Sequence, residues 1–276
     1  MGLTSGSLTS MQNPPKDHWS DLAQKWNRLA SPLRPCPEDV GIIQQALAPG
    51  GGSYLLLGVT PELTSPAGHL IALDHNAAMV AAVWPGNHGG RSAVQGDWLQ
   101  MPFAAHSFDA IIGDGSLTLL SYPSQYRGVL DQCKQVLKPG GKILIRLFAS
   151  PEQTETCAEV CAAARDRRID NFHAFKWRLS MALAAETHDV HVNVADTHAA
   201  FNRLLPDRKR LAETTGWTLE AINTIDFYAG SVARYSYPSL AQVRAILAPD
   251  FRETGLAQGS YELAERCPTL ILERDE

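Results

Sequence analysis

Residues 54–74 read YLLLGVTPELTSPAGHLIALD, and this stretch decides the fold. It contains two short apolar runs, 54–57 and 69–73, separated by a loop that is rich in Gly, Pro and Thr. Runs this short and this continuously apolar are typical of strands that are buried on both faces. A helical pattern follows the second run. We therefore expect two strands of a parallel sheet, with Gly58 and Asp74 at their carboxyl ends.

The same alternation of short strands and helices continues along the chain. Further apolar runs stand at 92–95, 108–113 and 142–148, and a helical segment lies between the last two. This order predicts an α/β fold with a Rossmann-like, doubly wound sheet. Two late apolar segments, 251–259 and 268–274, are expected to complete that sheet.

Composition and periodicity divide the chain into five regions. The expected regions are a flexible tail at 1–16, N-terminal helices at 17–50, an α/β core at 51–150, a mainly helical insert at 151–250 and C-terminal strands at 251–276. Within the insert, Asp170 and Asn171 mark a break before a helix that carries Phe172, Phe175 and Leu179 on one side. We expect this insert to cover a substrate.

Charge and composition exclude several classes of protein. The chain has 276 residues, and its 24 Lys and Arg against 29 Asp and Glu give a net charge of −5, which argues against nonspecific nucleic-acid binding. No apolar run approaches the roughly 20 residues of a membrane helix, and the first residues show no export or lipidation pattern, so we expect a cytoplasmic protein without a membrane partner. Five cysteines without metal-ligand spacing predict neither a disulfide framework nor a metal site.

Small or acidic residues follow two neighbouring strands, where ligands of open parallel sheets bind. Gly58 permits close approach of a ligand to the backbone, and Thr60 lies two positions further along the loop. Asp74 comes 16 residues after Gly58, about the interval at which an acidic residue meets ribose hydroxyls in such folds. We take Gly58, Thr60, Asp74 and the adjacent His75 as candidate cofactor-binding residues.

The next two strand ends add four more candidates. Gly96, Asp97 and Trp98 offer a carboxylate for an exocyclic amine and an aromatic surface for an adenine. Asp114 follows the strand at 108–113, where reacting groups usually meet in this type of fold. Upstream of the sheet, Arg34 stands between two prolines and is a candidate to reach a cofactor carboxylate.

From about residue 38 to 148, these segments together resemble a class I S-adenosylmethionine-dependent methyltransferase. The matching motifs, in order, are 55–58 (LLLG), 71–74 (IALD), 96–98 (GDW), 108–115 (FDAIIGDG) and 137–145 (LKPGGKILI). The resemblance implies a seven-stranded sheet whose last strand, here 268–274, runs antiparallel. It also implies S-adenosylmethionine as cofactor and S-adenosylhomocysteine as product.

The resemblance assigns a role to each candidate. Gly58 would lie against the methionine end of the cofactor, Asp74 on the ribose, 96–98 around the adenine and Asp114 near the sulfonium. One departure concerns the first motif, because Gly58 is followed by Val-Thr-Pro-Glu instead of further glycines. Pyrophosphate needs repeated glycines, so this loop makes a dinucleotide less suitable than a sulfonium nucleoside.

Each candidate also has a purely structural interpretation. Asp74 would serve equally as a cap of the following helix, and Asp114 as a turn residue. Asp97 and Trp98 would fit an ordinary loop and core edge, and Arg34 the surface. The basic residues of the insert, at 165–178 and 203–210, are either an acidic-substrate patch or a solvated helix face.

Together these patterns predict methyl transfer from S-adenosylmethionine to a small-molecule acceptor. Direct displacement at a sulfonium needs alignment and exclusion of water rather than a covalent residue, so no catalytic residue is assigned. Two alternatives stay open, a catalytically silent cofactor-binding module and an RNA or protein methyltransferase that uses the basic insert. The sequence indicates neither the acceptor atom nor the oligomeric state.

Overall fold

A computed structural model describes residue 19, residues 23–47 and residues 49–275. The tail expected at 1–16 lies outside these residues, as does part of the first expected helix. What is described there includes a short 3-10 turn, η1 (Trp26–Arg28). The helix expected from residue 37 is α2 (Pro37–Ala46), which starts where the Asp39 carboxylate accepts a hydrogen bond from the Cys36 backbone N–H at 2.9 Å.

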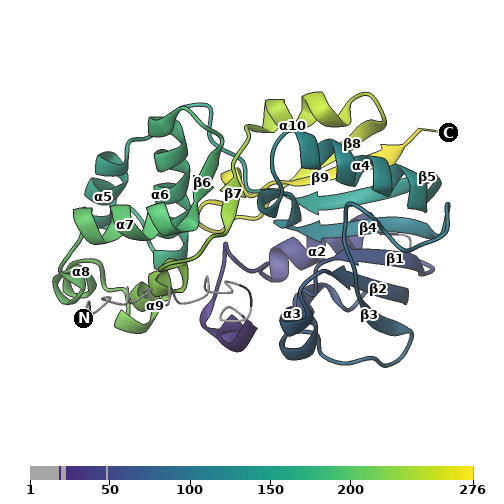
Figure 1. Ribbon diagram of the computed structural model, residues 1–276, viewed down its shortest axis with the longest axis horizontal. Helices are drawn as coiled ribbons and strands as arrows, with labels where there is room; N and C mark the ends of the chain where they lie inside the picture. Colours follow the sequence, from purple (N-terminus) through teal and green to yellow (C-terminus); the bar gives the residue numbers. More distant parts are fainter. Residues whose placement is uncertain (1–18, 20–22, 48, 276) are drawn as a thin grey trace, which may run out of the picture.

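Seven strands form the main sheet, in the spatial order β3-β2-β1-β4-β5-β9-β8 (Figure 1). Their bounds are β1 (Gly52–Leu57), β2 (Gly68–Asp74), β3 (Arg91–Gln95), β4 (Phe108–Asp114), β5 (Leu137–Arg146), β8 (Phe251–Ala257) and β9 (Thr269–Arg274). The first five pair in parallel, and β9 runs antiparallel between β5 and β8. The α/β class, the seven strands and the antiparallel last strand are thus confirmed.

Helices cover both faces of the sheet, because successive side chains of each strand point to opposite faces. From β1, Leu55 and Leu57 join the core beneath α4 (Ser124–Val136) and α10 (Leu240–Leu247). Tyr54 and Leu56 join the opposite core, beneath α2 and α3 (Ala77–Ala82). This double cover explains why the strands are nearly continuous apolar runs.

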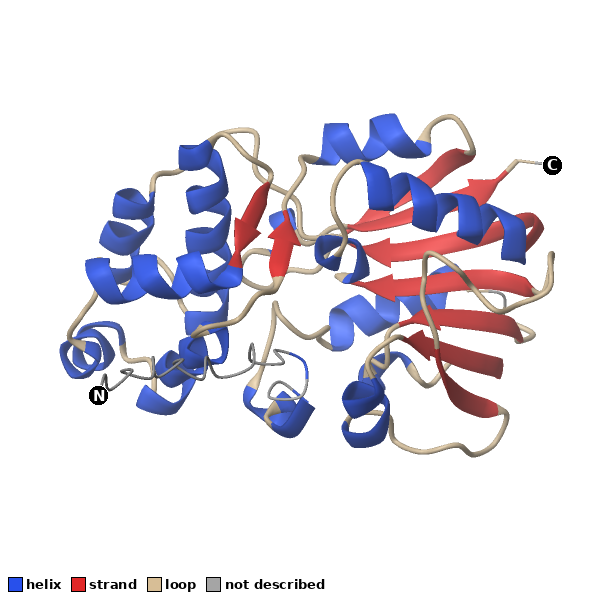
Figure 2. Ribbon diagram, viewed as in Figure 1, coloured by secondary structure: helices blue, strands red, loops and turns tan. Residues whose placement is uncertain are grey.

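The insert forms a separate lobe that faces the carboxyl ends of the parallel strands (Figure 2). It contains α5 (Cys157–Arg165), α6 (Phe172–Thr187), α7 (Val194–Leu204), α8 (Arg208–Thr215), α9 (Leu219–Asn223) and the 3-10 turn η4 (Thr224–Tyr228). Asn171 caps α6, since its side chain accepts a hydrogen bond from the Ala174 N–H at 2.9 Å. Two three-residue strands, β6 (His191–Asn193) and β7 (Arg234–Ser236), pair antiparallel within the lobe, which the sequence did not indicate because segments this short show no periodicity.

No helix within the described ranges is long and apolar enough to span a membrane.

Candidate active site

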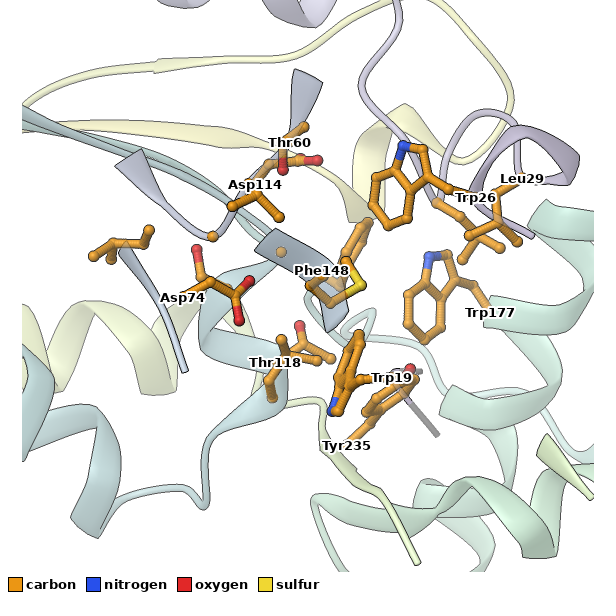
Figure 3. Close-up of a pocket in the computed structure, with 18 of the residues that line it drawn as sticks. Trp19, Trp26, Leu29, Thr60, Asp74, Asp114, Thr118, Phe148, Trp177 and Tyr235 are labelled. Carbon is orange, nitrogen blue, oxygen red and sulfur yellow. The ribbon is translucent and has the colours of Figure 1, made fainter. Parts of the chain in front are cut away.

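A pocket of about 800 Å³, including its mouth, separates the carboxyl ends of the strands from the insert. On one side it is lined by residues that follow β1, β2 and β4, and on the other by aromatic residues of η1, α6 and β7 (Figure 3). The pocket is therefore a site built by two parts of the chain that are far apart in sequence.

Gly58 brings the backbone of the loop after β1 close to the next two strand ends. Its φ is +101°, a conformation that residues with a side chain rarely adopt, and its N–H donates to the Leu73 carbonyl at 2.9 Å. A Cβ atom at this position would lie 3.9 Å from both Asp74 Oδ2 and Trp98 Cζ2. Gly58, Asp74 and Trp98, from three different loops, therefore meet at one corner of the pocket.

Asp74 presents one carboxylate oxygen to this corner. Its Oδ1 accepts a hydrogen bond from the Asn76 N–H at 2.8 Å, and Asn76 itself caps α3 through the Met79 N–H at 3.0 Å. Asp74 is thus not the helix cap, and no described donor bonds to its Oδ2. The carboxylate points into the pocket (Figure 3). Burial raises the pKa of Asp74, partly offset by the bond from Asn76.

Trp98 forms the wall beside Gly58. Its indole Nε1 donates to the Leu73 carbonyl at 2.6 Å, which leaves the ring as the surface toward the pocket. Gly96 does not line the pocket but lets the chain pass Leu73, since a Cβ there would be 2.8 Å from Leu73 Cδ1. Asp97 and His75 line an adjoining hollow that shares Trp98 with the main pocket. Asp97 Oδ1 accepts a bond from a neighbouring backbone N–H, as in an ordinary loop.

Asp114 lines the pocket but belongs to a buried ionic cluster. Its Oδ1 lies 2.5 Å from Nε of Arg146, whose guanidinium is fully buried at the end of β5. Arg146 also donates to the Pro32 carbonyl and the Tyr261 hydroxyl, both at 3.0 Å, and lies 3.5 Å from Asp39. Burial lowers the pKa of Arg146, but Asp114, together with Tyr261 and Asp39, more than offsets this, so the guanidinium stays charged. The cluster joins the strand ends to the N-terminal segment.

Arg34 acts on the pocket indirectly. Its Nε donates to Glu62 Oε1 at 2.7 Å, and the guanidinium lies over the Trp26 ring with 5.5 Å to the centroid. Glu62 belongs to the turn η2 (Pro61–Leu63), so the pair holds the loop after β1 against the N-terminal segment. Thr60, in the same loop, is buried and lines the pocket. Contact of Arg34 with a cofactor carboxylate stays a prediction, because its side chain is engaged with Glu62.

The insert contributes an aromatic wall and one amine. Trp177 and Tyr235 face the strand ends together with Trp26 and Phe148 (Figure 3). Lys176 lies in the same wall at 1% exposure, and its Nζ is 4.8 Å from the centroid of a tyrosine ring. Burial lowers the pKa of Lys176 to about 7.

Lys176 belongs to the basic run at 165–178, for which the sequence left open an acidic-substrate patch or a solvated helix face. Arg165, Arg167 and Arg168 are indeed exposed. Lys176, however, is one of six consecutive buried residues, 172–177, so this part of α6 is buried all round. No apolar stripe sets the lysine apart in the sequence, and its burial depends on what packs around α6.

The other basic residues near Lys176 do not reach the pocket. Arg178 donates to Glu155, a carboxylate that Arg266 also binds. His173 is buried behind the wall, and burial together with the charge of Lys176 lowers the pKa of its imidazole to about 3. No group of three or more described His, Cys, Asp or Glu residues is arranged to hold a metal ion.

The comparison with known proteins agrees with this geometry. Residues 47–145, which contain Gly58, Asp74, Trp98 and Asp114, match the family described as Methyltransferase domain. Over this segment, little more than a third of the chain, the protein is similar to methyltransferase domains. The matched segment supplies the strand-end side of the pocket, while the aromatic wall comes from outside it.

Relatives found by sequence match about a third of this chain, whereas similar solved structures cover most of it. Across 92 residues, 33% of this chain and 37% of the relative, the chain is 34% identical to the demethylmenaquinone methyltransferase of Corynebacterium glutamicum strain R. The chain therefore matches little more than a third of the length of such curated relatives.

The N-methyltransferase NodS of Bradyrhizobium japonicum, solved with S-adenosylhomocysteine, is 15% identical with a TM-score of 0.51, covering 94% of this chain and 100% of that one. A Rhodobacter sphaeroides protein described as a zinc-dependent alcohol dehydrogenase is 13% identical with a TM-score of 0.62, covering 94% and 97%. At these identities the likeness shows the fold alone.

Proposed function

We propose that this protein transfers a methyl group from S-adenosylmethionine to a small-molecule acceptor in the pocket between the strand ends and the insert. The observation that carries the proposal is the meeting of Gly58, Asp74 and Trp98, within 3.9 Å of one point, beside an aromatic-lined space. Three strand-end loops that meet in this way suit a nucleoside, and the space beyond them suits its acceptor.

The residues at the strand ends fit this cofactor. The positive φ of Gly58 leaves room where a side chain would stand, Asp74 Oδ2 is available to ribose hydroxyls, and the Trp98 ring offers a surface for adenine. Ser116 Oγ lines the same pocket, is buried and has no hydrogen-bond partner among the described residues, so it suits the amino-acid end. Only one glycine is present for a pyrophosphate, which supports a sulfonium nucleoside over NAD.

The bound cofactor would supply an electrophilic methyl group on a good leaving group. What the chain itself supplies is alignment and a dry environment. The aromatic wall, with Trp26 and Trp177 facing Asp74 and Asp114 across the pocket, presents apolar surface to the space between them, which disfavours water there once a cofactor is bound (Figure 3). The buried contacts of Arg146 hold the floor of the pocket in one geometry, as positioning requires.

Two observations support a small acceptor over a macromolecule. Apart from Lys176, the basic residues of the insert do not line the pocket, and Arg178 is paired with Glu155 and Arg208 with Asp226. The Corynebacterium relative is named for demethylmenaquinone, which is not a macromolecule. An aromatic acceptor suits the aromatic wall of this pocket.

Titration calorimetry with S-adenosylmethionine, S-adenosylhomocysteine and NAD tests the proposal. We expect both nucleosides to bind and NAD not to bind. The Asp74→Asn variant should weaken nucleoside binding by about 1 to 3 kcal/mol, because a charge-assisted bond to ribose is lost. The matched control is Asp166→Asn, which changes an exposed aspartate on the insert and should leave the dissociation constant unchanged. Binding of NAD alone, or an unchanged constant for a folded Asp74→Asn protein, would refute the cofactor site.

A further inference from the structure

Lys176 is buried in the pocket, and none of the carboxylates that the structure describes is paired with it. It projects from α6 between Phe175 and Trp177, is 1% exposed and lines the pocket. Lysine is rarely buried unless it is paired. Yet no described carboxylate lies within 4 Å of its Nζ, which lies over the face of the Tyr228 ring at 4.8 Å from the centroid.

The charged groups that face this part of the pocket are held by other partners. Asp114, from the sheet, is bonded to Arg146, and Asp74 accepts its bond from a backbone N–H. Tyr228 and Tyr235 of the insert line the pocket with raised pKa values and stay neutral near pH 7. His173, on the same helix, is neutral because burial and Lys176 lower its pKa.

Burial is therefore what controls the ionisation of Lys176. It lowers the pKa of the amine to about 7, so near neutral pH a large fraction of Lys176 carries a lone pair in place of a proton. A base is most effective when its pKa lies near the working pH. The direction of this shift suits an amine that accepts a proton inside an apolar pocket.

We propose that Lys176 is a catalytic general base that removes the proton from an aromatic hydroxyl group of the acceptor, held against the aromatic wall. This inference rests on the proposed function and adds the acceptor class and a catalytic residue to it. An aromatic hydroxyl is a weak nucleophile while protonated, and its ordinary pKa of about 10, as for tyrosine, leaves it neutral near pH 7. The aromatic side chains of the wall would pack against the ring of the acceptor, and the Lys176 amine would accept the proton of its hydroxyl group.

The step balances in atoms and charge. The hydroxyl proton moves to Nζ, and the oxygen keeps the electron pair of the O–H bond. That pair forms the new bond to the methyl carbon, while the sulfur keeps the pair of the broken C–S bond. One positive charge is thereby exchanged for another, since the sulfonium is neutralised as Lys176 becomes an ammonium. The ammonium then returns its proton to water.

The test uses 3-nitrophenol at pH 7, where the free phenol is mostly in its neutral, nearly colourless form, while its anion is yellow. It is added to protein saturated with S-adenosylhomocysteine, and binding is measured by calorimetry. We expect the wild-type protein to turn yellow as the phenol binds. The Lys176→Met variant should bind S-adenosylhomocysteine within about threefold of wild type but develop less than about a tenth of the yellow absorbance.

Lys209→Met, an exposed lysine of the same insert, is the matched control and should behave as wild type. Lys176→Gln replaces Lys176→Met if the latter does not fold. Yellow colour in a folded Lys176 variant, colourless binding to wild type, or no binding of the phenol at all would overturn the inference. If the wild-type protein fails to bind S-adenosylhomocysteine, the proposed function itself fails. Calorimetry with S-adenosylhomocysteine alone therefore distinguishes failure of the proposed function from failure of the inference about Lys176.

Discussion

Replacing Arg146 by Met should strongly destabilise the fold, because it removes the cation from the buried cluster beneath the pocket. The guanidinium is fully buried and bonds to Asp114 at 2.5 Å and to Pro32 and Tyr261 at 3.0 Å. Asp39, also fully buried, lies 3.5 Å away. Methionine keeps an unbranched apolar stem in place of the arginine stem and removes the charge, so the main effect is electrostatic.

The magnitude follows from the burial of the two carboxylates that remain. Breaking a buried ion pair by removing one partner costs about 3 to 5 kcal/mol, because the other charge stays in a medium that solvates it poorly. Asp39 keeps bonds from Cys36 and Tyr261, which prevents a larger cost. We therefore expect a loss of about 3 to 5 kcal/mol at pH 7, a large part of a typical free energy of unfolding of about 5 to 15 kcal/mol.

Urea unfolding followed by tryptophan fluorescence measures this loss. The matched control is Arg244→Met, which removes an exposed guanidinium bonded twice to Glu253 at 2.7 Å and should cost under about 1 kcal/mol. Adding Asp114→Asn to Arg146→Met should recover about 1 kcal/mol or more, because one uncompensated charge disappears. The loss should also shrink as the pH falls and the carboxylates take up protons. Equal costs for Arg146→Met and Arg244→Met would refute this reasoning.

Three further predictions concern the pocket. Gly58→Ala should cost about 1 to 3 kcal/mol in stability and also weaken binding of S-adenosylhomocysteine. Gly216, with a φ of +82° and no atom within 4 Å of an added Cβ, is the control, because Gly216→Ala should cost stability through backbone strain alone. Calorimetry that finds equal affinities of the two variants for S-adenosylhomocysteine would contradict this.

Without cofactor, Asp74→Asn should be more stable than wild type at pH 7, because burial raises the pKa of Asp74 and so disfavours its charged form. This gain in stability should disappear as the pH falls through the raised pKa to below the ordinary pKa of an aspartate. Urea unfolding that finds no gain at pH 7 would count against the prediction. Because the pKa of Lys176 is lowered to about 7 in the folded protein, the unfolded chain binds more protons than the folded chain between about pH 7 and 10.5. The stability of the wild type relative to Lys176→Met should therefore rise with pH in this window, by at most about 1.4 kcal/mol per pH unit. Parallel stability–pH curves for the two proteins would show that the amine is not buried in solution.

The sequence by itself determined the sheet and the corner of the pocket built from strand ends. Strands buried on both faces are continuous apolar runs, so β1 and β2 could be recognised without a partner strand. Their carboxyl ends follow from chain direction alone, which is why Gly58, Asp74 and Trp98 were identified and why the structure brings them together. The start of α6 at Asn171 was also predictable, because a helix cap is formed by residues three positions apart.

Only the tertiary structure decided which charged residues are buried and what they contact. Arg146 stands 114 positions from Pro32 and 32 from Asp114, and Arg34 stands 28 from Glu62, so no local pattern could join them. The aromatic wall likewise needs the insert to fold back over the strand ends. Lys176 shows the physical reason most clearly, because a basic side chain on a helix is solvated or buried according to what packs against that face, and packing is a property of distant segments.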